Sequence, residues 1–584
     1  MTGAGQNAPP GPAACARLID EAFATYNYHF RTVTQRAAGR FASCDWHGSQ
    51  RDAVQRIELY DRAVNRLVRR LRSLLGDAAT ERERWVAAKA SYRQRTRNYL
   101  DRAFHETFFN SVTRRIFGTV GVDPEVEFTE AQELADEAPK HSAIIRSHRY
   151  RGSVWSLMEE CLRAFPFQLE WDNFSGSVDR TVAAIEAAMA QQGERYALQG
   201  VEFLRPVFYR DYRAYLIGRM VGPRADTPLV IAIKHGDRGL LVDGIISDRK
   251  ELSILIGFAR SYLHVDLDPV RDAVLFLKSL LPAKPIGEVF TALGRAKQGK
   301  TERFRTLISH LKNTGDRFVD AAYDKGMVMI VFTPTDQPVI LKVIRDRFSS
   351  SKTVARREVE ERYRLVFKHD RAGRLVDAQE FRGLKFKRLR FSDDVLDELA
   401  REAKKTVRFE DDYVILDHVY VERQLTPLNV FLQQASESEQ RRAVLDYGQA
   451  IRDLATSNIF PGDLLLKNFG VTRHCRVIFY DYDELCRVTD CNFREMPQAQ
   501  TMEEEMGSPD WYYVAENDVF PEQFLNFLGL KDELATLFRD AHGELLTAGY
   551  WRDIKERILA GEVFEILPYR RPAYQYATQP GDTP

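Results

Sequence analysis

The sequence lacks the features that mark several large classes of protein. Its 584 residues contain six cysteines without C-x-x-C spacing, so neither a zinc site nor a disulfide framework is indicated. No uninterrupted apolar run reaches about 18 residues, and the N-terminus has no basic start followed by an apolar core. The 84 basic and 84 acidic side chains cancel, which gives no support to general nucleic-acid binding. These absences predict a cytoplasmic protein with neither a membrane nor a nucleic acid as partner.

The length of the chain predicts more than one domain, because a single hydrophobic core rarely extends beyond about 300 residues. Residues 14–117 carry apolar side chains at helical spacing, residues 200–248 have the pattern of strands, and helical patterns return up to about residue 315. We therefore predict that residues 1–315 form a mostly helical domain with a small sheet. Residues 1–12 are rich in Gly, Pro and Ala, and we expect them to be disordered.

Residues 316–584 begin with a different pattern. The runs MVMIVF and VILKVI, separated by TPTDQP, predict a β-hairpin, and a helix is expected over SKTVARREVEERYRLVF. Further strands follow, and amphipathic helices come after them. The fold class is therefore predicted as α+β, with a strand-rich lobe at about residues 316–421 and a helical lobe at about residues 425–570.

One segment matches a phosphate-binding motif literally. GRAKQGKT places Gly294, Gly299, Lys300 and Thr301 in the G-x-x-x-x-G-K-[ST] spacing of a P-loop, which needs a buried strand before it. The preceding IGEVFTAL has the pattern of an amphipathic helix instead, and no acidic strand follows to hold magnesium. A basic helix junction is the favoured interpretation, and whether the segment binds an anion stays open.

A second phosphate motif is defined by spacing. Asp463 and Asn468 in PGDLLLKN form the D-x-x-x-x-N interval of a protein-kinase catalytic loop, and Asp481 follows on VIFYDYDE. A carboxylate at Asp463 can take the proton of an acceptor hydroxyl, while Asn468 and Asp481 offer oxygen ligands to Mg²⁺ on nucleotide phosphates. Lys467 either offsets charge on the transferred phosphoryl group or is a surface lysine.

Two upstream features favour a kinase, whereas the predicted phosphate-covering loop differs from that of protein kinases. Lys342 lies within the apolar run VILKVI, where a kinase carries the lysine that meets nucleotide phosphates. Its partner should be a glutamate of the following helix, and among Glu358, Glu360 and Glu361 we favour Glu358. The loop AAYDKGMVM has one glycine, Gly326, where protein kinases have G-x-G-x-x-G. Since His-Arg is also absent before the catalytic-loop aspartate, an ordinary eukaryotic-type protein kinase is not indicated.

Several segments together closely resemble one family over about residues 15–570. AAYDKGMVMIVF, VILKVIRDRF, VERQLTPLNVFL, IFPGDLLLKNFGVTRH and FYDYDE resemble the bacterial isocitrate dehydrogenase kinase/phosphatase. The resemblance implies a regulatory domain at residues 1–315 and a bilobal protein-kinase-like domain at residues 316–584. It also implies one enzyme that phosphorylates a serine of NADP-dependent isocitrate dehydrogenase, inactivating it, and removes that phosphate again. Carbon would thereby be divided between the tricarboxylic acid cycle and the glyoxylate bypass.

The resemblance also implies where ligands bind. ATP or ADP with Mg²⁺ would occupy one cleft used by both reactions, with AMP as an allosteric effector. The nucleotide would lie against Lys342 and under a loop formed by Ala321, Ala322, Tyr323, Asp324, Lys325, Gly326 and Met327. The phosphatase reaction is assigned to Asp377 in LVDAQEF, which would position or activate water. Asp483 and Glu484 would be accessory acids near the metal or a polar strand exit.

Two other interpretations stay open at this point. The loop PGDLLLKN also resembles those of small-molecule phosphotransferases of the aminoglycoside-kinase type. A catalytically inactive nucleotide-binding scaffold would have lost Asp463, Asn468 or Asp481, and all three are present. Isocitrate dehydrogenase is the expected protein partner, and the oligomeric state, with a homodimer as one option, is not determined by the sequence.

Overall fold

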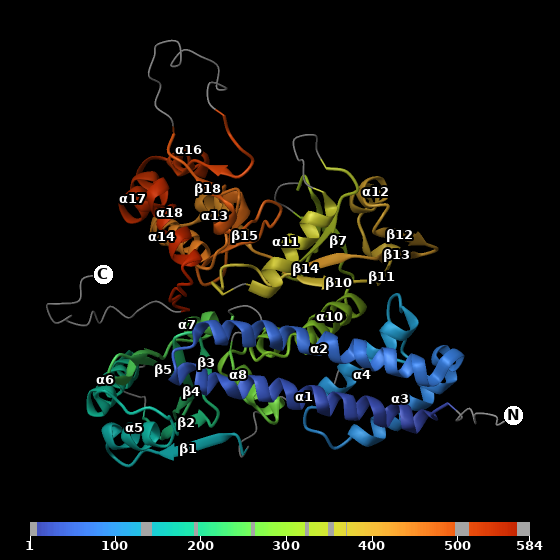
Figure 1. Cartoon of the computed structure of the whole chain (residues 1–584), viewed down its shortest axis with the longest axis horizontal. Coiled ribbons are helices and arrows are strands. Elements are labelled where there is room, and N and C mark those ends of the chain that lie inside the picture. The colour runs from blue at the N-terminus through green and yellow to red at the C-terminus, as the bar shows by residue number, and fades with distance from the viewer. Residues whose placement is uncertain are drawn as a thin grey trace, which may run out of the picture. The chain divides into compact units, whose positions relative to one another are not determined.

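The computed structural model describes residues 9–129, 143–191, 197–257, 263–321, 326–348, 355–369, 371–496 and 513–568. The chain forms two compact units, and it passes from the first to the second between Gly315 and Asp316. The first unit also takes in Gly383–Phe386 and Leu567, while the chain otherwise belongs to the second unit from Asp316 to Ile566. Figure 1 labels the elements of both units.

Helices dominate the first unit because long segments repeat apolar residues at helical spacing. In α2, Val64, Leu67, Val68 and Leu71 are buried on one face, while the arginines between them are exposed. The long helices α1 and α2 run alongside each other (Figure 1). The helices of this unit are α1 (Pro12–Ala42), α2 (Trp46–Leu75), η1 (Gly76–Thr80), α3 (Arg82–Thr96), α4 (Arg102–Phe117), α5 (Val154–Arg163), α6 (Phe174–Gln191), α7 (Arg249–Leu255), α8 (Val270–Leu280), α9 (Ile286–Ala292) and α10 (Ala296–Asn313).

An antiparallel sheet completes the first unit, in the order β1-β2-β4-β5-β6 with β3 paired to β4. Alternate residues of β4 pack into two different cores, Tyr215 and Ile217 into one, Ala214 and Leu216 into the other. Because both faces are covered, β4 and β5 are nearly continuous apolar runs. The strands are β1 (Ile145–Arg149), β2 (Gly200–Leu204), β3 (Phe208–Arg210), β4 (Arg213–Val221), β5 (Thr227–Gly236) and β6 (Gly239–Ile246).

The second unit begins with a five-stranded antiparallel sheet in the order β10-β14-β9-β8-β7. β8 and β9 form the predicted hairpin, with Val331 opposite Lys342. β9 is therefore the third strand of this sheet along the chain. The elements up to the end of the sheet are β7 (Phe318–Asp320), β8 (Met329–Pro334), β9 (Val339–Ile344), α11 (Arg356–His369), β10 (Gln379–Phe381), β11 (Leu384–Lys387), η2 (Arg388–Arg390), α12 (Asp393–Glu402), β12 (Val407–Glu410), β13 (Tyr413–Leu416) and β14 (Val419–Arg423).

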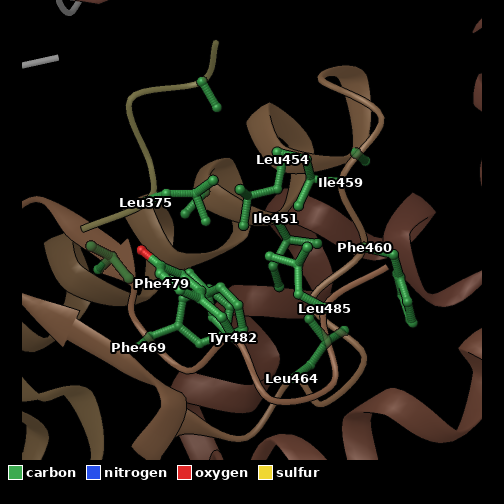
Figure 2. Close-up of a cluster of buried hydrophobic side chains, with 14 of the residues drawn as sticks. Leu375, Ile451, Leu454, Ile459, Phe460, Leu464, Phe469, Phe479, Tyr482 and Leu485 are labelled. Carbon is green, nitrogen blue, oxygen red and sulfur yellow. The ribbon is translucent and has the colours of Figure 1, made fainter. Parts of the chain in front are cut away.

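Helices are the main regular elements of the described chain after β14. α14 begins with a capping box between Ser436 and Glu439, which satisfies backbone N–H groups at its first turn. Figure 2 shows Ile451 and Leu454 of α14 in one hydrophobic cluster with Phe479 of β17. The elements are β15 (Thr426–Pro427), α13 (Leu428–Gln434), α14 (Glu437–Thr456), η3 (Leu466–Asn468), β16 (Phe469–Val471), β17 (Val477–Phe479), η4 (Val488–Asp490), β18 (Asn492–Phe493), β19 (Asp518–Val519), η5 (Pro521–Gln523), α16 (Phe524–Leu528), α17 (Asp532–His542), η6 (Gly543–Leu546) and α18 (Ala548–Leu559).

The predicted α+β class is confirmed. A mostly helical unit with a sheet is followed by a unit in which a sheet precedes helices. The disorder expected of residues 1–12 stays a prediction, since residues 1–8 lie outside the described residues and α1 begins at Pro12. Within the described ranges, no helix combines the length and the apolar composition needed to cross a lipid bilayer.

The segment GRAKQGKT is a helix junction, as favoured from the sequence. α9 precedes it instead of a strand, and α10 begins at Ala296, so Lys300 and Thr301 lie within a helix. Thr301 Oγ1 donates to the carbonyl oxygen of Lys297 at 3.1 Å, an ordinary contact between successive helical turns. Because a P-loop requires its lysine at the junction of a strand and a helix, this geometry excludes one here.

Candidate active site

The loop that carries Asp463 is tightly constrained. Asp463 Oδ1 accepts a hydrogen bond from the backbone N–H of Leu465 at 2.9 Å. Gly462 has a φ of +81°, and a Cβ at this position would lie 2.4 Å from the carbonyl oxygen of Glu484. Glycine is therefore required at this turn, and the loop lies directly against the chain that follows Asp481.

Asp463 lies among other acidic side chains. Burial raises the pKa of Asp463, and the negative charges of Glu484 and Asp481 raise it further, while a hydrogen bond with the Asn468 side chain opposes the rise. The predicted base and both predicted metal ligands are therefore close neighbours. Oxygen donors with an excess of negative charge suit Mg²⁺, which prefers carboxylate and amide oxygens. Asn468 and Asp481 would hold the metal, and Glu484 adds to the negative charge around it.

Lys342 contacts the same group of residues from the sheet. Its Nζ donates to the carbonyl oxygen of Tyr480 at 2.9 Å, one residue before Asp481. The same Nζ forms an ion pair with Glu422 Oε2 at 2.7 Å. Lys342 is 7% exposed and Glu422 2% exposed. Because an unpaired buried ammonium group is costly, Glu422 on β14 stabilises a lysine in this buried strand.

The prediction that Glu358 pairs with Lys342 is wrong in this structure, where Glu422 is the partner. Glu358 is exposed on α11, and Glu360 and Glu361 form ion pairs with arginines of their own helix. Ordinary protein kinases take this glutamate from the helix that corresponds to α11, and the prediction followed that pattern. Glu422 lies on a strand, and its only indication in the sequence is an acidic residue within the apolar run VYVE.

Helix α11 presents an aromatic side chain to the site instead. The ring of Tyr363 is buried and stacks on Tyr420 of β14, with 3.9 Å between centroids. Burial raises the pKa of the Tyr363 hydroxyl well above its ordinary value, and the charges of Glu422, Asp483 and Asp481 add to the rise. The hydroxyl therefore stays protonated beside these acids. No sequence pattern singles out Tyr363, because an aromatic residue on a helix is usually part of a core.

The predicted phosphate-covering loop joins β7 to β8. Ala321, Gly326 and Met327 belong to the described residues, whereas Ala322, Tyr323, Asp324 and Lys325 lie outside them. The backbone N–H of Ala321 donates to the carbonyl of Val331 at 3.2 Å. At the other end, Arg345 Nε donates to the carbonyl oxygen of Gly326 at 3.0 Å. Both ends of the loop are thus anchored to the sheet that carries Lys342.

The side chain of Lys467 is exposed, and its backbone carbonyl contacts the site. The Tyr480 hydroxyl donates to the carbonyl oxygen of Lys467, which ties the catalytic loop to the residue before Asp481. The role of the Lys467 ammonium group stays a prediction.

Asp377 follows a segment that is bonded to the strand leading to Asp481. Leu375 forms a parallel bridge with Phe479, and the N–H of Val376 donates to the Phe479 carbonyl at 3.1 Å. Asp377 and Asp481 each come two residues after a bridged residue, so both follow the same parallel bridge along the chain. The neighbouring Gln379 side chain donates to Asp377 Oδ2 at 3.0 Å and orients the carboxylate.

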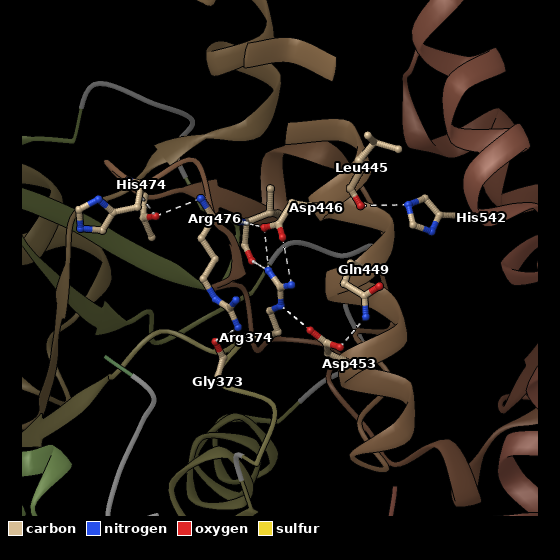
Figure 3. Close-up of polar contacts among 11 residues, drawn as sticks. Gly373, Arg374, Leu445, Asp446, Gln449, Asp453, His474, Arg476 and His542 are labelled. Atoms are coloured by element: carbon tan, nitrogen blue, oxygen red, sulfur yellow. Dashed lines mark hydrogen bonds and ion pairs between the residues drawn. The ribbon is translucent and has the colours of Figure 1, made fainter. Parts of the chain in front are cut away.

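A buried ion network holds this segment in place (Figure 3). Arg374 is 2% exposed, and it donates to Asp453 and Asp446 of α14, each at 2.7 Å. It also donates to the carbonyl of Val477 on β17 at 3.0 Å. Burial alone would raise the pKa of Asp446. The positive charge and hydrogen bonds of Arg374 hold this pKa below its ordinary value instead. The network joins α14, β17 and the segment before Asp377.

Replacing Arg374 by methionine should destabilise the second unit by about 3–5 kcal/mol, because Asp446 and Asp453 would stay buried without their cation. Since the pKa of Asp446 is lowered in the folded chain, its stabilisation is complete above an ordinary Asp pKa of about 4 and is lost as the pH falls through the lowered value. Without Arg374, burial favours the protonated form of Asp446. The difference in stability between variant and wild type should therefore shrink as the pH falls from about 7 toward about 4. Hydrogen exchange of peptides from α14 and β17 measures this difference.

The matched control for this variant is Arg408→Met. Arg408 pairs with Asp417 on the surface of the same unit, with Nε to Oδ2 at 2.8 Å, and exposed pairs of this kind contribute little. Exchange in α14 and β17 should be unchanged in the control. Equal protection in Arg374→Met and wild type would contradict the role given to the network.

Three features define a phosphotransferase of the protein-kinase type. They are the sheet with a buried lysine on its third strand, the D-x-x-x-x-N loop and the aspartate after β17. Two family models divide the chain between them. "Isocitrate dehydrogenase kinase/phosphatase (AceK), regulatory domain" matches residues 16–315, and "Isocitrate dehydrogenase kinase/phosphatase (AceK) kinase domain" matches residues 316–571. The chain belongs to the isocitrate dehydrogenase kinase/phosphatase family.

Curated relatives agree with the family models over nearly the whole chain. The isocitrate dehydrogenase kinase/phosphatase of Anaeromyxobacter sp. (strain Fw109-5) is 46% identical over 561 residues, which is 96% of this chain and 97% of the relative. The protein of the same name from Anaeromyxobacter dehalogenans is 46% identical over 568 residues, 95% and 96% of the two chains. That from Xanthomonas campestris pv. campestris (strain 8004) is 41% identical, with the same coverage of 95% and 96%.

Proposed function

We propose that this chain phosphorylates a serine of NADP-dependent isocitrate dehydrogenase and removes the same phosphate. Relatives that carry this activity in their names are similar over at least 95% of this chain, which supports the proposal. The main structural support for the proposed chemistry is that Asp463, Asn468, Asp481 and Lys342 lie close together in one unit. Inactivation and reactivation of the dehydrogenase would then set the division between the tricarboxylic acid cycle and the glyoxylate bypass.

In the kinase reaction, each residue of the site has one task. Asp463 accepts the hydrogen bond of the serine hydroxyl and then its proton, and burial with the neighbouring acids makes it a stronger base than an exposed aspartate. Lys342, which donates to the Tyr480 carbonyl in this structure, would instead meet the nucleotide phosphates, and the predicted loop from Ala321 to Met327 would cover them. Asn468 and Asp481 would hold Mg²⁺, which would supply positive charge to the phosphates. Lys467 offers further positive charge during transfer.

In the phosphatase reaction, Asp377 takes the place of Asp463 as the base. Its carboxylate, oriented by Gln379, positions a water molecule and accepts a proton from it as the water attacks the phosphoserine phosphorus. The bridge between Leu375 and Phe479 keeps Asp377 beside the strand of Asp481, so both reactions draw on one nucleotide and metal site. This arrangement supports a single cleft for two opposed reactions.

Regulation is assigned to the first unit. AMP would act as an effector that binds one functional state more tightly and so changes the balance of kinase and phosphatase. We propose that the enzyme acts in the cytoplasm and that isocitrate dehydrogenase is its protein partner. Whether it forms a homodimer is an open part of the proposal.

Labelled ATP with purified isocitrate dehydrogenase tests the proposal directly. We expect label on one serine of the dehydrogenase and a proportional loss of dehydrogenase activity. When excess ADP replaces ATP, the label should be released and the activity should recover. Kanamycin serves as the small-molecule acceptor in a parallel reaction. Label on kanamycin with none on the dehydrogenase would favour the aminoglycoside-kinase type instead, and no transfer to either acceptor would favour an inactive scaffold.

A further inference from the structure

Two thiols that the proposed mechanism does not use lie close to the catalytic loop. The Sγ atoms of Cys486 and Cys491 are 3.5 Å apart, and both cysteines are free thiols. The short helix η4 lies between them, and its turn brings the side chains together. Cys491 is 3% exposed, whereas Cys486 is only half-buried. A small reagent therefore meets Cys486 first and finds Cys491 within contact of it.

The surroundings make the two thiols chemically different. The hydrogen bond with Cys491 lowers the pKa of the Cys486 thiol, whereas burial and the negative charges of Asp490 and Glu484 oppose this. The positive charge of Arg362 on α11 acts in the same direction as the hydrogen bond. The hydrogen bond and burial both raise the pKa of Cys491. One thiol is thus disposed to react as a thiolate, and the other is held protonated beside it. A reactive cysteine with a resolving partner is the usual arrangement of a redox-sensitive pair.

The backbone of Cys486 is bonded to the chain that enters the catalytic loop. The Phe460 N–H donates to the Cys486 carbonyl at 2.9 Å, and the Cys486 N–H donates to the Phe460 carbonyl at 3.0 Å. Phe460 comes three residues before Asp463, and Gly462 between them lies against Glu484. A displacement at Cys486 therefore reaches the Asp463 loop through two backbone hydrogen bonds and one close contact.

We propose that Cys486 and Cys491 are a redox modification site that hydrogen peroxide converts to an intramolecular disulfide. The Cys486 thiolate attacks one peroxide oxygen, the O–O bond breaks, and a sulfenic acid and one water result. The Cys491 sulfur then displaces the hydroxyl group as a second water and forms the S–S bond. Two thiols and one peroxide give one disulfide and two waters. A dithiol reductant restores both thiols by exchange and leaves as its own disulfide.

Formation of the disulfide should slow phosphoryl transfer. The sulfurs must approach from 3.5 Å to a bond length of about 2.05 Å, and the chain around Cys486 must move to allow this. A shift of about 1 Å in a catalytic group lowers turnover by as much as about 100-fold. We therefore expect a loss of about 10- to 100-fold in the oxidised enzyme, fully reversed by dithiothreitol. This consequence rests on the proposed function, whereas the disulfide itself does not.

Peptide mapping tests the disulfide without any assay of activity. Trypsin cleaves after Arg476, Arg487 and Arg494, so the two cysteines fall in the separate peptides 477–487 and 488–494. The full chain is treated with stoichiometric hydrogen peroxide in its folded state, free thiols are alkylated, and the protein is digested without reductant. We expect the two peptides joined as one species, which separates on reduction. Two alkylated peptides, or a cross-link that forms only in denatured protein, would overturn the proposal.

Three serine variants complete the test. Cys491→Ser should stop at a sulfenic acid on Cys486, which dimedone traps, and should give no cross-linked peptide. Cys486→Ser should remain unreactive at this site, and Cys475→Ser, half-buried elsewhere in the same unit, should oxidise like wild type. Phosphoryl transfer should lose its reversible peroxide sensitivity in the first two variants and keep it in the third. A cross-link without loss of transfer would overturn the coupling to the Asp463 loop.

Discussion

Asp377→Asn is expected to lower the rate of dephosphorylation by about 10²–10⁴-fold while phosphorylation of isocitrate dehydrogenase changes by no more than a few-fold. Asparagine keeps the size of the side chain and an oxygen that accepts from Gln379, but it cannot take a proton from water. The segment also stays bridged through Leu375 and Phe479, which depends on the backbone alone. Release of phosphate from phosphoserine-labelled dehydrogenase and transfer from labelled ATP measure the two rates.

Asp397→Asn is the control for this variant, because Asp397 is an exposed acid on α12 of the same unit. Both rates should match wild type in the control. An equal fall of both rates in Asp377→Asn would mean that the residue supports the shared cleft and has no separate phosphatase role.

Asp463→Asn is expected to lower phosphorylation by about 10²–10⁴-fold with nucleotide affinity nearly unchanged. The variant keeps the acceptor for the Leu465 N–H, so the loop should retain its shape, but it loses the base. In the wild type, activity should decline with acidification through a pKa above the ordinary aspartate value, because protonated Asp463 cannot accept the serine proton. The residual activity of the variant should lack this acidic limb.

A pH–rate profile of single-turnover transfer, together with fluorescent-nucleotide binding, separates these effects. Nucleotide affinity that falls in parallel with the rate would contradict a role limited to proton transfer, and an unchanged acidic limb would assign that limb to another group. The Asp397→Asn variant again serves as the control with wild-type behaviour.

The parts of the site that lie close together in the sequence could be predicted, because covalent spacing fixes them. Asp463 and Asn468 share one short loop, and Lys342 is conspicuous as a charge inside an apolar strand. Glu422 could not be found in this way. It meets Lys342 only because β9 and β14 pair with Tyr420 opposite Lys342, a register that depends on tertiary folding.

The segment around Asp377 shows the same limit. Asp377 was singled out only by the family resemblance, since a lone aspartate near a strand has no pattern of its own. Arg374 looked like any of the many arginines of the chain, and only the pairing with Asp446 and Asp453 of α14 reveals its role. In the first unit, by contrast, helical periodicity was enough to predict the long helices, because it depends on local spacing alone.

The ion pair of Lys342 with Glu422 has a consequence for how such an enzyme can be switched. Ordinary protein kinases are turned off when the helix that carries the paired glutamate swings away, and the lysine loses its partner. Here both partners belong to neighbouring strands of one sheet, so outward movement of α11 leaves the pair intact. Displacement of a helix, which separates this lysine from its glutamate in ordinary protein kinases, would therefore not switch this pair off.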